Sequence, residues 1–179
     1  MAERLTSLAA VLPPDTRLLV LGSMPGAASL AAQQYYAHPR NAFWPIMSQL
    51  FGFAADLPYP QRLMQLQAQG IGLWDVLQSC ERQGSLDSAI RAETPNDFAS
   101  LLQQQPQIRA LAFNGAKAAQ SFRKLVLPTL APEQVVKAMH AKGIIMSSTP
   151  YRKSYARFAP SLINNEQEIE RALAVLQAL

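Results

Sequence analysis

Short apolar runs alternate along the chain with segments whose apolar residues recur every three or four positions. Four of the runs predict buried strands, because each is brief, apolar and closed by turn-forming residues. They cover residues 17–21, 71–76, 109–113 and 144–146. Gly22 and Asn114 directly follow two of these strands, so the chain is expected to turn there.

Helical periodicity occupies the intervals between the strands. The stripes cover residues 5–12, 43–50, 63–70, 98–102, 116–125 and 169–179. We expect Pro13 to stop the first helix, Gly70 to cap the third at its C-terminus and Asn96 to cap the fourth at its N-terminus. Residues 127–142 remain ambiguous, although Pro132 is a typical first residue of a short helix.

Strands that alternate with helices predict an α/β fold. We expect a three-layer α/β/α sandwich around a central, mainly parallel four-stranded sheet. No repeat or linker divides the sequence, so a single domain over residues 1–179 is predicted. In such sheets, ligands bind beyond the carboxyl ends of the strands. That rule selects the loops at residues 22–26, 114–115 and 147–150, which are rich in small or polar side chains.

The balance of charge favours a polyanionic partner without identifying one. Sixteen basic and twelve acidic residues give the 179-residue chain a net charge of +4. A basic cluster with interleaved tyrosines follows the last predicted strand, and such clusters can hold a phosphate backbone. It consists of Tyr151, Arg152, Lys153, Tyr155 and Arg157. The alternative for this cluster is a solvated charged face.

We expect no protein-bound metal and no cofactor. Cys80 is the one cysteine of the chain, which excludes a disulfide framework, a zinc–cysteine cluster and an iron–sulfur site with four thiolates. The two histidines, His38 and His140, have no partners at ligand spacing. These three residues are interpreted as structural.

Several functional classes lose support from the motifs. The sequence has no glycine-rich dinucleotide fingerprint and no phosphate loop ending in Gly-Lys-Ser/Thr. The run GSMPG at residues 22–26 also differs from the Gly-x-Ser-x-Gly of a hydrolase nucleophile elbow. No segment is apolar for long enough to span a membrane, and the first residues lack the apolar region of a signal peptide. We expect a monomer in the cytoplasm with no membrane partner.

Five segments place distinctive residues in or near these loops. In order they read GSMPG (22–26), YYAHPRNAFW (35–44), GIGLWDV (70–76), CERQGSLDS (80–88) and FNG (113–115). Together they resemble the hypoxanthine-DNA glycosylases, a branch of the uracil-DNA glycosylase superfamily, over most of the chain. The last motif departs from that family, because MSSTP (146–150) and Tyr151-Arg152-Lys153 replace Pro-Ser-Thr-Ser-Pro and small residues.

The resemblance implies hydrolysis of the N-glycosidic bond of a nucleotide that has been rotated out of DNA. By the same resemblance the catalytic residue is Asn41, whose amide oxygen can hold a water molecule. The superfamily's best-known branch has an aspartate in the first loop, where this sequence has Met24. Without a strong base, we expect a dissociative reaction in which water attacks late. The alternative is that Asn41 caps the helix at 43–50.

The resemblance also implies how the flipped base is held. Asn114 matches the superfamily's base-reading asparagine, and Phe43 is the preferred stacking face. Ser23 and Met24 belong to the loop expected to contact the base and its sugar. Two alternatives stay open: Asn114 as a simple turn residue, and Phe43 as a core residue with Trp44 taking the stacking role.

Contacts to the DNA backbone are expected near the last predicted strand. The residues are Ser147, Ser148, Thr149, Tyr151, Arg152 and Lys153. Tyr151 or Arg152 is expected to enter the gap that the flipped base leaves. Asp75 and Asp87 are interpreted as structural acceptors for backbone amides.

The predicted partner is double-stranded or single-stranded DNA carrying a deaminated base, with hypoxanthine as the first candidate. No lysine matches an amine nucleophile, so we expect a monofunctional enzyme that leaves an abasic site. Three alternatives remain: a superfamily member specific for uracil or mismatched pyrimidines, a non-catalytic nucleic-acid-binding relative, and an α/β module for a free nucleotide.

Overall fold

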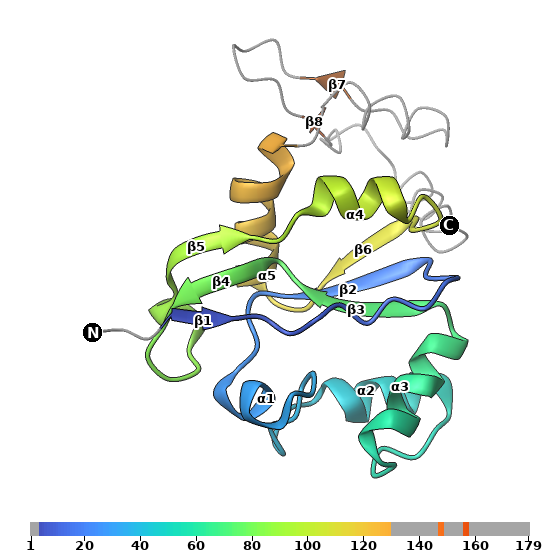
Figure 1. Cartoon of the computed structure of the whole chain (residues 1–179). Coiled ribbons are helices and arrows are strands. Elements are labelled where there is room, and N and C mark those ends of the chain that lie inside the picture. The colour runs from blue at the N-terminus through green and yellow to red at the C-terminus, as the bar shows by residue number, and fades with distance from the viewer. Residues whose placement is uncertain (1–3, 130–146, 149–155, 158–179) are drawn as a thin grey trace, which may run out of the picture. The chain divides into compact units, whose positions relative to one another are not determined.

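The computed structural model describes residues 4–129, 147–148 and 156–157. The chain divides into two compact units, residues 1–121 and 122–179. The first unit contains both of the larger sheets and all five α-helices that the structure describes (Figure 1). The single domain expected from the sequence stays a prediction.

A parallel sheet with the order β3-β2-β6 lies at the centre of the first unit. It is formed by β2 (Leu18–Gly22), β3 (Ile71–Asp75) and β6 (Ala110–Phe113). Three predicted strands and their parallel arrangement are thereby confirmed, but the described sheet has three strands where four were expected. The fourth predicted strand, at residues 144–146, lies outside the described residues. Leu19 and Leu21 are fully buried, as expected for a strand covered on both faces.

A second, antiparallel sheet has the order β1-β4-β5. Its strands are β1 (Arg4–Thr6), β4 (Leu77–Glu81) and β5 (Arg91–Pro95). The sequence predicted none of the three as a strand. A sharp turn joins β3 to β4, and there Val76 and Leu77 donate backbone hydrogen bonds to Gly22 and Ser23.

The helix predicted over residues 5–12 is wrong. Leu5 pairs with Cys80 in β4, and Val11 forms an antiparallel bridge with Leu73. The apolar spacing suits a helix, but hydrogen bonds to neighbouring strands replace the helical ones. Gly72 permits this approach, because a Cβ there would lie 2.8 Å from the Val11 carbonyl oxygen.

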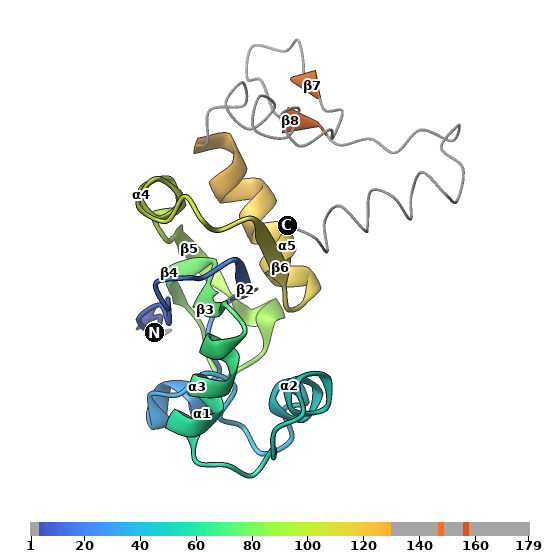
Figure 2. The same ribbon diagram turned by 90° about the vertical axis from the view of Figure 1, so that its right-hand side faces the viewer.

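The helices cover both sides of the strands (Figures 1 and 2). On one side lie α1 (Ala27–Ala32), α2 (Phe43–Phe51) and α3 (Tyr59–Ala68). On the other lie α4 (Phe98–Gln104) and α5 (Ala116–Ser121). This is the predicted layered α/β arrangement, although α1 was not anticipated. No helix in the described part of the chain is long and apolar enough to cross a membrane.

Two of the expected helix caps differ in detail. The side chain of Asp97, not Asn96, accepts the hydrogen bond from the Ser100 amide at the start of α4. Asn96 instead donates its side-chain amide to the Asp75 carbonyl oxygen at 2.8 Å. At the C-terminal end of α3 the C-cap position is Gln69, and the predicted cap Gly70 is the residue after it, with φ +69°, a conformation suited to glycine.

An apolar core lies between the parallel sheet and the helices α2 and α3. Its buried members are Leu8, Val20, Tyr35, Phe43, Trp44, Leu66, Ile71 and Leu73. The Trp44 indole donates to the Tyr35 carbonyl oxygen at 3.0 Å, which fixes the segment leading into α2. This core supports one wall of the site described below.

The second unit is described in part. It begins with a π-helical turn at Phe122–Val126 and a 3₁₀ turn at Leu127–Thr129. The helix predicted over residues 116–125 therefore keeps its α-helical form only as far as Ser121. Further along, β7 (Ser147–Ser148) pairs with β8 (Ala156–Arg157) in antiparallel fashion. The helix predicted over 169–179 and the ambiguous residues 130–142 lie outside the described residues.

Candidate active site

A cavity of about 280 Å³ opens at the carboxyl edge of the parallel sheet. Its walls come from the loop after β2, the segment between α1 and α2, the end of β3, the β4–β5 loop and the residue after β6. Four predicted site residues, Ser23, Met24, Asn41 and Asn114, all line it. Two of the three loops chosen from the strand-end rule therefore meet at one cavity.

Asn41 enters this cavity from the turn before α2. Its side-chain oxygen accepts a hydrogen bond from the Phe43 amide at 2.9 Å, so the residue also supports the helix start. Ala42 occupies the formal N-cap position. Because an amide oxygen has two lone pairs, this contact leaves room for a second donor such as water. The cap contact and the proposed water contact are thus compatible.

Asn114 stands directly after β6, and its backbone amide donates to the Leu21 carbonyl oxygen at 2.8 Å. This bond extends the sheet by one residue and fixes where the Asn114 side chain begins. Gly115 follows with φ +116°, so the chain turns away sharply. The predicted turn is confirmed, and the same geometry presents the amide to the cavity.

Tyr36 lines the cavity and was not singled out from the sequence. Its backbone is left-handed, with φ +56°, a conformation that costs a non-glycine residue about 1 to 2 kcal/mol. The buried hydroxyl has no partner with full hydrogen-bond geometry among the described residues, and the Asn114 side chain lies close enough to interact with it. Burial raises the pKa of Tyr36 to about 12, against the opposite effect of the neighbouring Asn114 side chain. The group therefore stays a neutral potential donor.

Phe43 lies outside the cavity lining. Its side chain is 5% exposed, and its ring stacks on that of Tyr36 with centroids 3.9 Å apart. Trp44, the other stacking candidate, is 3% exposed and meets Phe43 edge-on. Phe43 therefore supports the Tyr36 ring and Trp44 supports Phe43, so Tyr36 is the residue of these three that reaches the cavity.

The loop after β2 is held in place by polar contacts from the β4–β5 region. The Ser23 hydroxyl donates to an Asp87 carboxylate oxygen at 2.7 Å. Arg82, which is 2% exposed, donates to the carbonyl oxygens of Met24 and Pro25. Its guanidinium also lies close enough to influence Asp75 electrostatically. Arg82 belongs to the CERQGSLDS segment, but no role was predicted for it from the sequence.

Asp75 ends β3 with its carboxylate at the cavity. It accepts a hydrogen bond from the Ser7 hydroxyl at 2.9 Å and is 3% exposed. Burial raises the pKa of Asp75 to about 7, although the Ser7 and Tyr35 hydroxyls and the Arg82 charge oppose that rise. The sequence predicted that Asp75 accepts from backbone amides, but the donor observed is the Ser7 hydroxyl.

Gly22 makes room for this carboxylate. A Cβ at Gly22 would lie 2.6 Å from Asp75 Oδ1, closer than such atoms approach one another. The hydroxyl of Tyr36 is 3.7 Å from the same point. The first glycine of the GSMPG run is thus required by a specific neighbour, not only by the turn.

The remaining predicted contacts belong to the second unit. Ser147 and Ser148 form β7. Thr149, Tyr151, Arg152 and Lys153 lie outside the described residues. Their proposed contacts to the DNA backbone stay predictions.

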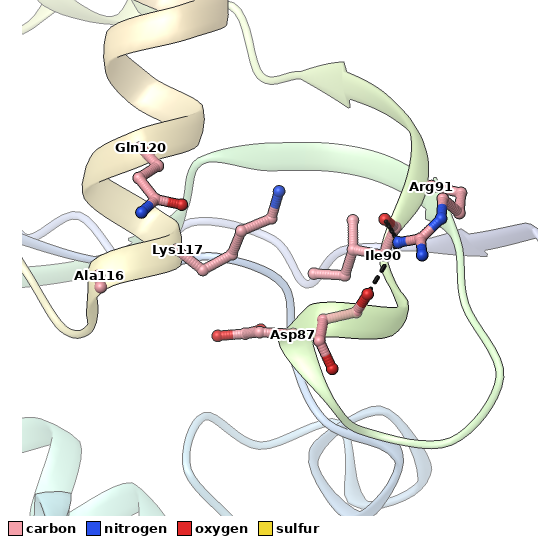
Figure 3. Close-up of a pocket in the computed structure, with 7 residues that line it drawn as sticks. Asp87, Ile90, Arg91, Ala116, Lys117 and Gln120 are labelled. Atoms are coloured by element: carbon pink, nitrogen blue, oxygen red, sulfur yellow. Dashed lines mark hydrogen bonds between the residues drawn. The ribbon is translucent and has the colours of Figure 1, made fainter.

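A second, larger cavity of about 460 Å³ adjoins the first, because Asp87 lines both. Figure 3 shows Lys117 and Gln120 reaching it from α5 and Arg91 from the opposite side. Lys117 forms an ion pair with Glu93. Arg91 turns back and donates to the carbonyl oxygens of Ser88 and Ile90 at 2.8 and 2.7 Å. No group of three or more potential metal ligands occurs among the described residues.

Comparisons with known proteins agree with this geometry. A family model of the uracil DNA glycosylase superfamily matches residues 9–177. A hypoxanthine DNA glycosylase of Methanosarcina acetivorans is 43% identical over 110 residues, covering 61% of this chain and 70% of the relative. One of Methanosarcina barkeri is 38% identical over 108 residues, covering 60% and 68%. The solution NMR structure of a uracil DNA glycosylase candidate from M. acetivorans matches with a TM-score of 0.62 and 35% identity, over 77% of this chain and 80% of that one.

Proposed function

The chain belongs to the uracil DNA glycosylase superfamily, and from that premise we propose that it excises hypoxanthine from DNA by hydrolysing the N-glycosidic bond of deoxyinosine. The observation that carries this proposal is the meeting of Asn41 and Asn114 at one cavity on the carboxyl edge of the sheet. The two relatives named hypoxanthine DNA glycosylases support the choice of base.

The bond to be cut is hidden inside a base stack, so the nucleotide must rotate out into a pocket. Cleavage then places positive charge on the sugar and negative charge on the departing base. Asn41 orients the attacking water through its amide oxygen, which is too weakly basic to remove a proton in advance. Met24 adds no base. These groups suit a dissociative reaction, in which the glycosidic bond is largely broken before water attacks.

The leaving base is held by neutral donors. Hypoxanthine presents O6 and N7 as acceptors, like the matching edge of guanine. The Asn114 amide and the buried Tyr36 hydroxyl offer donors on the same wall of the cavity. Donors aimed at the developing negative charge lower the barrier. Phe43 was expected to stack on the base. In this proposal Tyr36 stacks on the base instead, and the Phe43 ring packs behind the Tyr36 ring.

The decisive experiment is a base-release assay. Oligonucleotides carrying one deoxyinosine, deoxyuridine or mismatched pyrimidine are incubated with the protein as duplexes and as single strands. We expect release of free hypoxanthine from deoxyinosine. Preferential release of uracil would instead establish the uracil-specific alternative, and no release of any base would favour a non-catalytic relative.

Asn41→Ala tests the mechanism within that assay. The variant is expected to lose at least about 100-fold in cleavage rate, since water is no longer positioned. Binding to the lesion duplex is retained because the donors to the base remain. Equal activity in the variant would remove Asn41 from the mechanism. Borohydride treatment is expected to trap no covalent adduct, in keeping with a monofunctional enzyme.

We also propose that the second unit grips the DNA backbone through Ser147, Ser148, Thr149, Tyr151, Arg152 and Lys153. The affinity for DNA should then fall with increasing salt, and less steeply in Arg152→Ala. Action as a monomer in the cytoplasm stays a prediction.

A further inference from the structure

The lining of the candidate active site contains two carboxylates that differ in exposure. Asp75 is 3% exposed and accepts a hydrogen bond from the Ser7 hydroxyl. Asp87 is exposed and stands at the rim that the two cavities share. It forms no ion pair with any residue that the structure describes, although Arg91 and Lys117 line the larger cavity. The described part of the chain therefore leaves the charge of Asp87 available to a ligand.

The Ser23 hydroxyl links Asp87 to the covered part of the cavity. Ser23 directly follows β2, is 8% exposed and donates to Asp87 Oδ1 at 2.7 Å. The sequence predicted that Asp87 accepts from backbone amides, but the donor observed is this hydroxyl. Because the hydroxyl hydrogen points to Asp87, the lone pairs of Ser23 Oγ remain free to accept from another donor in the cavity, such as water.

The proposed reaction needs a negative charge close to the sugar. Cleavage places positive charge on the sugar, and the first loop supplies no carboxylate because Met24 stands there. The sugar of an extruded nucleotide stays tied to the strand outside the pocket, so it lies near the rim of the cavity. Asp87 stands at that rim, and exposed carboxylates are ionised at neutral pH. A fixed charge in that place stabilises a cation that develops only in the transition state.

We propose that Asp87 is a second catalytic residue, which stabilises the sugar cation by its charge and accepts a proton of the attacking water through Ser23. The base leaves with the bonding electron pair, and C1′ then bonds to the water oxygen. One water proton moves to Ser23 Oγ while the Ser23 hydroxyl proton moves to Asp87 Oδ1. The departed base takes up a proton from solvent, and Asp87 later returns its proton to solvent. The proposal rests on the proposed function, in which Asn41 orients this water.

Asp87→Asn is the central test, because an amide oxygen can still accept from Ser23 while the charge and the proton acceptor are lost. Single-turnover release of hypoxanthine from a deoxyinosine duplex should slow about 100-fold. Binding is measured on a duplex with 2′-fluorinated deoxyinosine, which resists cleavage. The Kd should stay unchanged or tighten by up to about threefold, since a negative charge beside the phosphates has gone. Asp87→Glu, which keeps a carboxylate, should recover at least about a tenth of the parent rate.

Ser23→Ala tests the proton route, and Asp56→Asn is the matched control. Ser23→Ala keeps the carboxylate but removes the relay, so the rate should fall about 10-fold. The double variant with Asp87→Asn should be no more than about twofold slower than Asp87→Asn alone, because both changes interrupt one path. Asp56 is exposed between α2 and α3 and lines neither cavity. Asp56→Asn makes the same change in net charge and should leave the rate unchanged.

The outcomes separate the two proposals. If the parent chain releases no base from any substrate, the proposed function fails. If the parent is active and Asp87→Asn cleaves within about threefold of it, the catalytic role is refuted and Asp87 only anchors Ser23, while the function stands. A loss of binding as large as the loss of rate would refute that role too. Losses from Ser23→Ala and Asp87→Asn that multiply in full would refute the proton route.

Discussion

The two adjoining cavities share Asp87 but use their polar groups in opposite ways. In the larger one, Lys117 is paired with Glu93 and Arg91 is bonded to carbonyl oxygens of its own loop. In the smaller one, the Tyr36 hydroxyl has no partner with full hydrogen-bond geometry within the described chain, and Asp75 is buried beside it. Volume alone would select the larger cavity. Polar groups left for a ligand select the smaller one.

The origin of the two linings explains this difference. The smaller cavity collects residues from the carboxyl ends of three parallel strands: Asp75 is the last residue of β3, and Ser23 and Asn114 directly follow β2 and β6. Hydrogen bonds of the sheet fix those positions. The larger cavity lies between α5 and the β4–β5 region (Figure 3), where Lys117 is paired with Glu93 and Arg91 is bonded to backbone carbonyl oxygens. A rigid frame with unsatisfied groups suits catalysis, because its dipoles need no reorganisation during the reaction.

Removing one amide side chain from each cavity should give the largest difference in activity between the two. Asn114→Ala is expected to lower kcat/KM on deoxyinosine roughly 100- to 1000-fold, as loss of one donor to developing charge does. Gln120→Ala removes an amide from the larger cavity and should change the rate by less than about twofold. Both are measured by base release under single-turnover conditions. Comparable losses in the two variants would mean that the site extends into the larger cavity.

The pH dependence of stability tests whether Asp75 is as buried as its contacts indicate. Its folded-state pKa of about 7 lies above the unfolded value, so the stability it contributes is full at low pH and is lost as pH rises through 7. Asp75→Asn removes this loss. Relative to the parent, the variant should gain about 3 kcal/mol in unfolding free energy between about pH 5 and pH 8.

Urea denaturation at the two pH values measures this gain. A difference between variant and parent that stays constant with pH would show that the carboxyl group titrates normally. The activity of Asp75→Asn at each pH separately reports whether the charge of this group matters to the chemistry in the cavity.

The parts predictable from sequence are those governed by local pattern. The strand β2 is a short apolar run closed by Gly22, and Asn114-Gly115 marks the end of β6. The sequence therefore predicted the edge of the sheet at which the cavity opens. Helix α2 followed from its apolar spacing. Asn41 and Asn114 came from the family resemblance, and the structure brings both to one cavity.

The parts missed depend on contacts between distant segments. Residues 5–12 have helical spacing, yet Leu5 and Val11 pair with strands more than sixty positions away. The bond from Arg82 to the Met24 carbonyl oxygen spans 58 positions. The left-handed backbone of Tyr36, which brings this ring rather than Phe43 to the cavity, has no signature in residue type. Local periodicity carries no information about any of these.

Replacing one arginine at each cavity compares how much a buried and an exposed side chain contribute to the free energy of unfolding. Arg82→Met keeps length and apolar bulk but removes the donors to the Met24 and Pro25 carbonyl oxygens. We expect a loss of about 3 kcal/mol in unfolding free energy, because charged hydrogen bonds disappear from a buried site. Arg91→Met, at the larger cavity, should cost under about 0.5 kcal/mol. Equal costs for both, measured by urea denaturation, would contradict a special role for Arg82 in holding the first loop.

The two ends of the GSMPG run offer the smallest test, made by adding a single methyl group. Gly22→Ala places a Cβ 2.6 Å from Asp75 Oδ1, so the carboxylate or the strand must shift. We expect a destabilisation of roughly 2 kcal/mol and a lower rate of base release, because the displaced carboxylate borders the cavity. At Gly26 the nearest atom to an added Cβ is Ser85 Oγ at 3.6 Å, which is ordinary contact. Gly26→Ala should therefore be almost neutral in urea denaturation, and a comparable loss at both glycines would show that the turn, and not Asp75, requires the glycine at position 22.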